Sequence, residues 1–254
     1  MKITVLGCGT STGVPRIGGD WGACDPKDPR NRRTRSSIVV EAGGVRVLVD
    51  TGPDLAAQML ACGIDQIDAV LWTHDHADHC HGIDDLRQLS QRNRAQIPGY
   101  GSARTMAALR QRFSYIFQGN KGYPTVCTGH EINSSHCFGE MLVECVEQPH
   151  GPVQSTGLLF KHGGKSMGYA IDFSSITDDM VALYRQCDLL ILDALRHEPH
   201  PTHAHIAMSL ELGRLTGARR LLLSHMDKSL DFSTLSAELP AHAAPAHDGL
   251  VVTL

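Results

Sequence analysis

One short segment of the chain concentrates side chains that bind metals. Residues 73–79 read Thr-His-Asp-His-Ala-Asp-His and follow directly on an apolar run at 69–72. Imidazole nitrogens and carboxylate oxygens are the ligands that zinc and manganese prefer in proteins. A loop at the end of a buried strand can aim several such groups into one small volume, which a solvated surface loop would not explain. The ligand-type residues that we select here are His74, His76, Asp78 and His79.

Three further residues of the same types also follow apolar, strand-like runs. They are His150 after 141–147, Asp172 after 166–171 and His225 after 221–223. Strand ends that meet at one edge of a sheet bring residues distant in sequence into one site. Each histidine alone fits a surface or core position equally well. Together with the 73–79 segment, however, the three residues predict one centre with seven ligands.

Short β-rich runs alternate with helical runs along the chain, which is typical of an α/β fold. The pair Gly43-Gly44 predicts a hairpin between two strands. Residues 113–137 are rich in Gly, Asn, Thr and Ser and predict a long, functional loop. Strands are expected at 3–6, 37–41, 45–49, 69–72, 97–100, 141–147, 157–161, 166–171, 189–192 and 221–223. Helices are expected at 54–61, 82–92, 103–112, 176–186 and 206–216.

Composition limits the classes of function. The 254 residues suit one domain spanning 1–254, and a net charge of −4 gives no general attraction for nucleic acid or an anionic membrane. No run approaches the ~20 apolar residues that a membrane span needs. The opening Met-Lys-Ile-Thr-Val-Leu-Gly predicts a first strand and not a signal peptide. Eight cysteines without a C-x-x-C pair favour a reduced, cytoplasmic protein, while fifteen histidines suggest metal or proton-transfer chemistry.

The pattern H-x-H-x-D-H followed by His, Asp and His resembles the ligand set of the metallo-beta-lactamase superfamily, over Asp50 to His225. This resemblance implies a four-layer αββα sandwich. It implies that Asp172 bridges two metal ions and that Asp50 orients a metal-bound histidine, although Asp50 could also be a simple turn residue. The implied ligands are His74, His76 and His150 for the first ion, and Asp78, His79 and His225 for the second.

An aspartate at the bridging position, where true beta-lactamases carry cysteine, favours phosphoester hydrolysis over lactam opening. Two divalent ions, whether Mn, Zn or Fe, supply a nucleophile and neutralise charge that develops on a phosphoryl oxygen. We assign catalytic roles to Asp78 and His203. By resemblance, His203 matches a histidine that protonates the leaving oxygen or binds the phosphate, and His205 is a nearby competitor for that role.

Three stretches outside the ligands look like the superfamily branch that contains the phosphodiesterase of the carbon-phosphorus lyase pathway. They are Gly7–Pro15, Asp28–Ser37 and Pro201–His203. The likeness implies a small, cyclic phosphodiester substrate such as a cyclic ribose phosphate or a 2',3'-cyclic nucleotide. The glycine loop fails the dinucleotide fingerprint. One departure is that the branch enzyme carries a cysteine-rich zinc site after this loop, where residues 18–25 hold only Cys24.

The same stretch contains a cationic run that could contact a substrate phosphate or could simply be solvated. Its members are Arg30, Arg32, Arg33 and Arg35. A ribonuclease Z-like endonuclease, a glyoxalase II-like thioesterase and a non-catalytic ligand-binding scaffold remain the alternative functions. We expect a small phosphodiester as the partner, with no extended nucleic acid and no membrane, and a homodimer is common in such families.

Overall fold

The computed structural model describes residues 1–254 and contains two seven-stranded mixed sheets. The first sheet has the order β14-β1-β2-β3-β4-β5-β6, in which β3 to β6 run parallel and the other neighbours antiparallel. The hairpin between β2 and β3 turns at Gly43 and Gly44, both at positive φ, as predicted. Its strands are β1 Lys2–Gly7, β2 Ser37–Ala42, β3 Val45–Val49, β4 Ala69–Leu71, β5 Ile97–Gly101, β6 Cys127–Glu131 and β14 Val251–Thr253.

The second sheet has the order β13-β12-β11-β10-β9-β8-β7. Here β10 to β13 run parallel and β7 to β10 antiparallel. The parallel strand β11 is buried along its whole length, as expected for a strand covered on both faces. Its strands are β7 Ser135–Phe138, β8 Met141–His150, β9 Val153–His162, β10 Lys165–Ala170, β11 Leu189–Asp193, β12 Leu221–Ser224 and β13 Ala243–Pro245.

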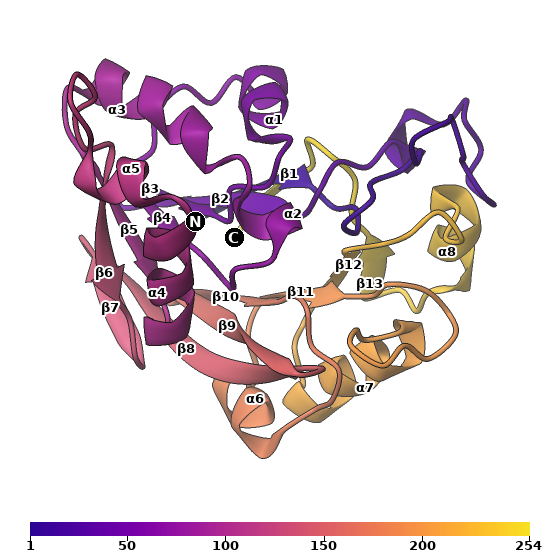
Figure 1. Ribbon diagram of the computed structural model, residues 1–254. Helices are drawn as coiled ribbons and strands as arrows, with labels where there is room; N and C mark the ends of the chain where they lie inside the picture. The colour runs from indigo at the N-terminus through magenta and orange to yellow at the C-terminus, as the bar shows by residue number, and fades with distance from the viewer.

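The two sheets stack face to face between two helical layers (Figure 1), which is the predicted αββα sandwich. Helices α1 and α3 lie outside the first sheet, and α6 and α7 lie outside the second. The helices are α1 Leu55–Cys62, α2 Ala77–Cys80, α3 Leu86–Asn93, α4 Ala103–Arg112, α5 Ser114–Gln118, α6 Asp178–Leu183, α7 Ile206–Thr216 and α8 Phe232–Glu238, with 3₁₀ turns η1 Pro29–Asn31 and η2 Ile83–Asp85.

Strand β2 shows how the sequence places its side chains in this sandwich. Successive side chains of a strand point to opposite faces. Accordingly Ile38 and Val40 join a cluster of 41 buried residues that includes both sheets, whereas Val39 joins a separate cluster with residues of α1, α3 and α4. Both faces of the first sheet are therefore apolar and packed against other elements. This packing holds the ends of its strands in place.

The structure differs from the sequence-based expectations in three places. The long loop predicted for residues 113–137 is wrong, because the segment contains α5, β6 and β7. The single helix predicted at 82–92 is divided into η2 and α3, with α2 preceding both. The sequence did not predict α8, nor the strands β13 and β14, each of which forms one edge of its sheet.

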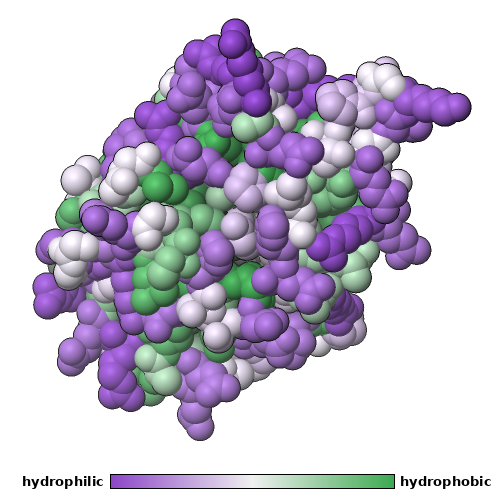
Figure 2. All heavy atoms as spheres, turned by 90° about the vertical axis from the view of Figure 1, so that its left-hand side faces the viewer, coloured by the Kyte–Doolittle hydropathy of each residue, from purple (hydrophilic) through white to green (hydrophobic).

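Figure 2 views the end of the sandwich that carries α3, α5, β6 and β7. Hydrophilic side chains there surround several separate apolar patches. No helix of the fold has the length and apolar character required to cross a bilayer.

Candidate metal centre

The candidate ligands lie where strands end, at one edge of the sandwich. Asp50 follows β3, Asp172 follows β10 by two residues, and His225 follows β12. All three have positive φ angles, 64°, 57° and 58° respectively, which non-glycine residues adopt at a cost of about 1–3 kcal/mol each. This backbone conformation turns the chain sharply at each of the three strand ends. His150 is itself the last residue of β8.

The His74–His79 segment is held against the first sheet by close backbone contacts. The amide of Thr51 donates to the carbonyl of His79, and the amide of Gly82 donates to the carbonyl of Thr51. A Cβ atom at Gly82 would lie 2.0 Å from the carbonyl oxygen of Gly52, so only glycine fits there. The loop after β3 therefore fixes α2, which carries Asp78 and His79.

A first group of three histidines converges at this edge. His74, His76 and His150 offer ligand atoms that all lie within 4.8 Å of one another. The distance from His150 Nε2 to His76 Nδ1 is 3.2 Å. His150 Nδ1 donates to the carbonyl of Thr202 at 2.6 Å, so its Nε2 keeps a free lone pair.

A second group contains Asp78, His79 and His225, again within 4.8 Å of one another. Asp172 lies between the two groups. Its Oδ2 is 3.4 Å from His74 Nε2 and 2.7 Å from His79 Nε2, and its Oδ1 is 3.4 Å from His225 Nε2. The structure thus brings all seven sequence-predicted residues together, with Asp172 between the two groups.

Three buried ring nitrogens show that the residues of this centre fit metal ions. The Nε2 atoms of His74, His79 and His225 are buried and make no well-aligned hydrogen bond, although oxygens of the Asp172 carboxylate lie 2.7–3.4 Å away. Buried polar atoms are normally paired, so three that converge unpaired require a ligand. The chain carries His/Asp clusters typical of a dinuclear metal site.

The electrostatics of the centre also favour cations. Burial, together with the nearby His79, holds the pKa of His74 well below its usual value and keeps the ring in the neutral, ligating form. Burial acts in the same direction on His225, but the carboxylates of Asp172 and Asp193 outweigh it and raise the pKa of His225 to about 10. A site that so strongly favours positive charge suits divalent ions.

His203 stands beside the centre, in contact with two carboxylates. Its Nδ1 is 2.9 Å from Asp172 Oδ1 and 3.2 Å from Asp193 Oδ2. Burial lowers the pKa of His203, but these carboxylates outweigh burial and raise it to about 9. Asp193 is fully buried and also lies 3.5 Å from His225 Nδ1. Sequence reasoning missed Asp193, although it closes the apolar run of β11 much as Asp50 closes β3.

Gly7 of the glycine loop and Arg33 of the arginine run have structural roles. A Cβ at Gly7 would lie 2.2 Å from the carbonyl of Arg35, so this glycine lets β1 approach the neighbouring chain closely. Arg33 is buried and donates to the carbonyls of Asp227 and Leu230. Arg30 forms an ion pair with Asp28. Because Arg33 is buried, it cannot make the contact with a substrate phosphate that was considered for this run. Arg35 forms an ion pair with Asp54.

Known proteins similar to this chain share its fold over its full length. A solved PhnP-family diphosphatase is 37% identical, with a TM-score of 0.90, and the match covers 100% of this chain and 97% of that one. Zinc-bound PqqB from Methylobacterium extorquens is 20% identical with a TM-score of 0.78 over 100% of both chains, which shows the fold alone.

Two curated relatives also match. An octanoyltransferase from Porphyromonas gingivalis is 32% identical over 260 residues, and a ribonuclease Z from Bradyrhizobium diazoefficiens is 38% identical over 142 residues. The matches cover 98% and 52% of this chain but only 51% and 46% of the relatives, so the chain spans about half their length. The model of the beta-lactamase superfamily domain matches residues 45–226. The chain therefore belongs to the beta-lactamase superfamily and is similar over its full length to a PhnP-family diphosphatase.

Proposed function

We propose that this chain is a dinuclear metal-dependent phosphodiesterase that hydrolyses a small phosphodiester, such as a cyclic ribose phosphate or a 2',3'-cyclic nucleotide. The observation that carries this proposal is the position of His203 at the rim of a seven-ligand centre, with Nδ1 held by Asp172 and Asp193. The full-length likeness to a PhnP-family diphosphatase supports hydrolysis at phosphorus.

In this proposal each ion has its own set of histidines. His74, His76 and His150 would hold the first ion, Asp78, His79 and His225 would hold the second, and Asp172 would serve both. Mn, Zn and Fe all suit histidine and aspartate ligands. When bound, a pair of such ions supplies a nucleophile at neutral pH and neutralises charge on the phosphoryl oxygens.

His203 then serves as the proton donor to the leaving oxygen. Its Nδ1–H donates to Asp193, which leaves Nε2–H for the substrate. Before metal binds, the carboxylates of Asp172 and Asp193 outweigh burial and raise the pKa of His203 to about 9, which favours the protonated ring. A positioned acid of this kind contributes ~100 to 10,000-fold to rate. Asp78 joins the catalytic set because its carboxylate lies within 3.6 Å of both His79 Nε2 and His225 Nε2 and so borders the second ion.

A phosphoanhydride is the second candidate substrate, because the similar solved protein is named a diphosphatase. The metal ligands and His203 would serve this reaction too, because it also requires attack at phosphorus and protonation of the leaving group, here a phosphate. Two relatives bring other chemistry into the comparison, because they are named an octanoyltransferase and a ribonuclease Z.

A substrate panel tests the proposal directly. The chain is loaded separately with Mn, Zn or Fe and assayed on bis-p-nitrophenyl phosphate, 2',3'-cyclic nucleotides, a diphosphate diester, S-lactoylglutathione, an octanoyl thioester, precursor tRNA and a cephalosporin. We expect kcat/KM for a cyclic diester to exceed that for either thioester at least about 100-fold, about 2.7 kcal/mol in transition-state stabilisation. Faster turnover of a thioester, of RNA or of the lactam would overturn the proposal.

A further inference from the structure

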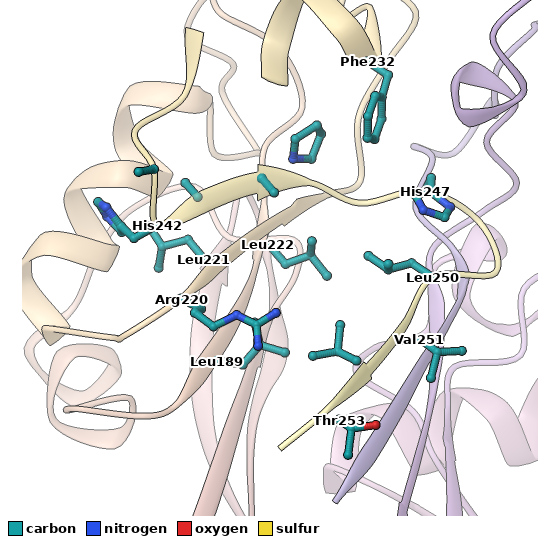
Figure 3. Close-up of a pocket in the computed structure, with 15 residues that line it drawn as sticks. Leu189, Arg220, Leu221, Leu222, Phe232, His242, His247, Leu250, Val251 and Thr253 are labelled. Atoms are coloured by element: carbon teal, nitrogen blue, oxygen red, sulfur yellow. The ribbon is translucent and has the colours of Figure 1, made fainter. Parts of the chain in front are cut away.

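The metal centre lies on the edge of the sandwich where β3 and β12 end. A cleft of about 700 Å³ between the free edges of the two sheets (Figure 3) is a separate feature. It includes Leu221 at the start of β12, whereas His225 follows the other end of that strand, and four extended residues span about 13 Å. The side chains that hold the ligands in place therefore belong to other parts of the fold.

Among the histidines of the centre, His76 is the one that is exposed and lacks an orienting partner. The other four are buried, and each has a ring nitrogen within 3.5 Å of a hydroxyl, carboxylate or carbonyl oxygen. The ring of His76 makes one hydrogen-bond contact, with Nε2 of His150, which is a candidate ligand of the same ion. Metal-binding histidines are normally oriented by a further partner. A ligand that is not fixed through its ring has to be fixed through its backbone.

The backbone just before His76 is held by Arg112, the last residue of α4. The guanidinium of Arg112 pairs with the carboxylate of Asp75 and also donates to the carbonyl of Asp75. The thiol of Cys80 donates to the same carbonyl at 3.4 Å. Residues 75–80 therefore form a closed turn that contains three candidate ligands, and Arg112 contacts this turn from the outside.

Helix α4 is firmly packed, so Arg112 extends from a fixed point. Met106 and Leu109 are fully buried in the cluster that also includes residues of α1 and α3. The side chain of Ser102 accepts a hydrogen bond from the amide of Thr105 and caps the start of the helix. A guanidinium presents several donors in one plane, which allows contact with a carboxylate and a carbonyl at the same time.

We propose that Arg112 is a positioning residue of the metal centre, which holds Asp75 and thereby fixes the backbone that presents His76 to the first ion. This inference rests on the ligand sets of the proposed function and not on the identity of the substrate. The side chain of Arg112 is 43% exposed, and an ion pair in such a place adds little to the stability of a fold. Its effect should therefore appear in metal binding and not in the stability of the metal-free chain.

The test measures the zinc affinity of the full chain by competition with a chromophoric chelator, which resolves the binding of the two ions. We expect Arg112→Gln to weaken the binding of one ion about tenfold, equivalent to about 1.4 kcal/mol. Arg110→Gln is the matched control, because Arg110 lies in the same last turn of α4 and donates to the carbonyl of Gly129 on β6. Its affinity for both ions should stay within about twofold of the unsubstituted chain. The metal-free Arg112→Gln variant should melt no lower than metal-free Arg110→Gln.

Two double variants show whether the effect passes through Asp75 and His76. Adding Asp75→Asn to Arg112→Gln should weaken zinc binding no further, because the contact between the two side chains is already broken. The His76→Ala variant retains only the second ion in this proposal. Adding Arg112→Gln to it should leave the affinity for that ion within about twofold.

Three results would overturn the inference. The first is zinc binding by Arg112→Gln as tight as by Arg110→Gln. The second is an equal loss of affinity for both ions, or a loss for the remaining ion in the His76→Ala background, because Arg112 would then not act through His76. The third is a lower melting temperature of metal-free Arg112→Gln than of metal-free Arg110→Gln, because the contact would then stabilise the fold itself. Binding of fewer than two ions by the unsubstituted chain would overturn the proposed function as well.

Discussion

The Nδ1 atom of His79 lies 2.7 Å from Oδ2 of Asp50, and both side chains are fully buried. The same carboxylate accepts hydrogen bonds from the backbone amide and the hydroxyl of Thr73. That hydroxyl lies 3.0 Å from His74 Nδ1. One buried carboxylate therefore orients two histidines of the centre and leaves the Nε2 atom of each ring directed at the metal position.

Replacing Asp50 with asparagine should lower the affinity for divalent metal about 10–100-fold, because removing such an orienting partner has that effect in metalloenzymes. Competition with a chelator measures the affinity. Asp65→Asn is the control, since Asp65 is exposed and pairs only with Arg92 on the surface. If Asp50→Asn binds metal as tightly as Asp65→Asn, then Asp50 is only a turn residue.

His203→Ala should retain both metals and lose about 100 to 10,000-fold in kcat on a diester with a poor leaving group. The loss should be smaller with p-nitrophenolate, which leaves without a proton. His205→Ala is the control, since His205 begins α7 without contacting Asp172 or Asp193. Metal loss in the His203→Ala variant would show that His203 is a metal ligand. An equal loss of rate in the His205→Ala variant would contradict the assignment of His203 as the proton donor.

His76→Ala should lose metal from the first group and with it diester turnover, while the neighbouring His81→Ala should keep both. His81 follows α2 and packs on Phe113, outside the centre. Metal per chain by elemental analysis and kcat in matched buffers provide the measurements. Chelation of the unsubstituted chain should reduce its melting temperature, because binding to the folded state alone adds stability.

Asp231 gives a pH dependence unrelated to the metals. Burial opposes its ionisation, but hydrogen bonds from the amides of Thr234 and Asp25 and from Asn31 outweigh burial and lower its pKa. The unfolded value is about 3.9. Its contribution to stability is therefore complete above about pH 5 and is lost as pH falls through the lower folded pKa.

Asp231→Ala should cost about 1 kcal/mol of unfolding free energy at pH 7, since the side chain also caps α8. The difference in unfolding free energy between this variant and the unsubstituted chain should narrow toward pH 2. Denaturant titrations at several pH values measure the unfolding free energy of both proteins. Glu238→Ala, on the same helix, should show no such convergence, and a constant gap for Asp231→Ala across the pH range would contradict the assignment.

The convergence of the seven candidate ligands was predicted from the sequence more completely than the fold around them. Ligand-type residues after apolar runs are local signals, and His74, His150 and His225 all lie where such runs predicted strand ends. Asp193 carries the same signal at the end of β11 and was overlooked because no motif drew attention to it.

Elements whose stability comes from neighbouring strands were not predictable in this way. The segments β6 and β7 read Cys-Thr-Gly-His-Glu and Ser-His-Cys-Phe, without the alternation that marks a strand. They are strands because β5 and β8 supply hydrogen-bonding edges. Strands β13 and β14 are three residues each and likewise exist only through pairing with β12 and β1.

The left-handed backbone at Asp50, Asp172 and His225 has a consequence for how this protein could change. Glycine is the residue that such a conformation suits best, yet glycine supplies no ligand. We expect glycine at any of the three positions to yield a more stable folded chain than alanine does there, although both remove a ligand at positions 172 and 225 and the orienting carboxylate at position 50. In a descendant freed from catalysis, glycine would therefore replace these residues at lower cost than alanine, and persistence of Asp, Asp and His would record continued selection for the metal centre.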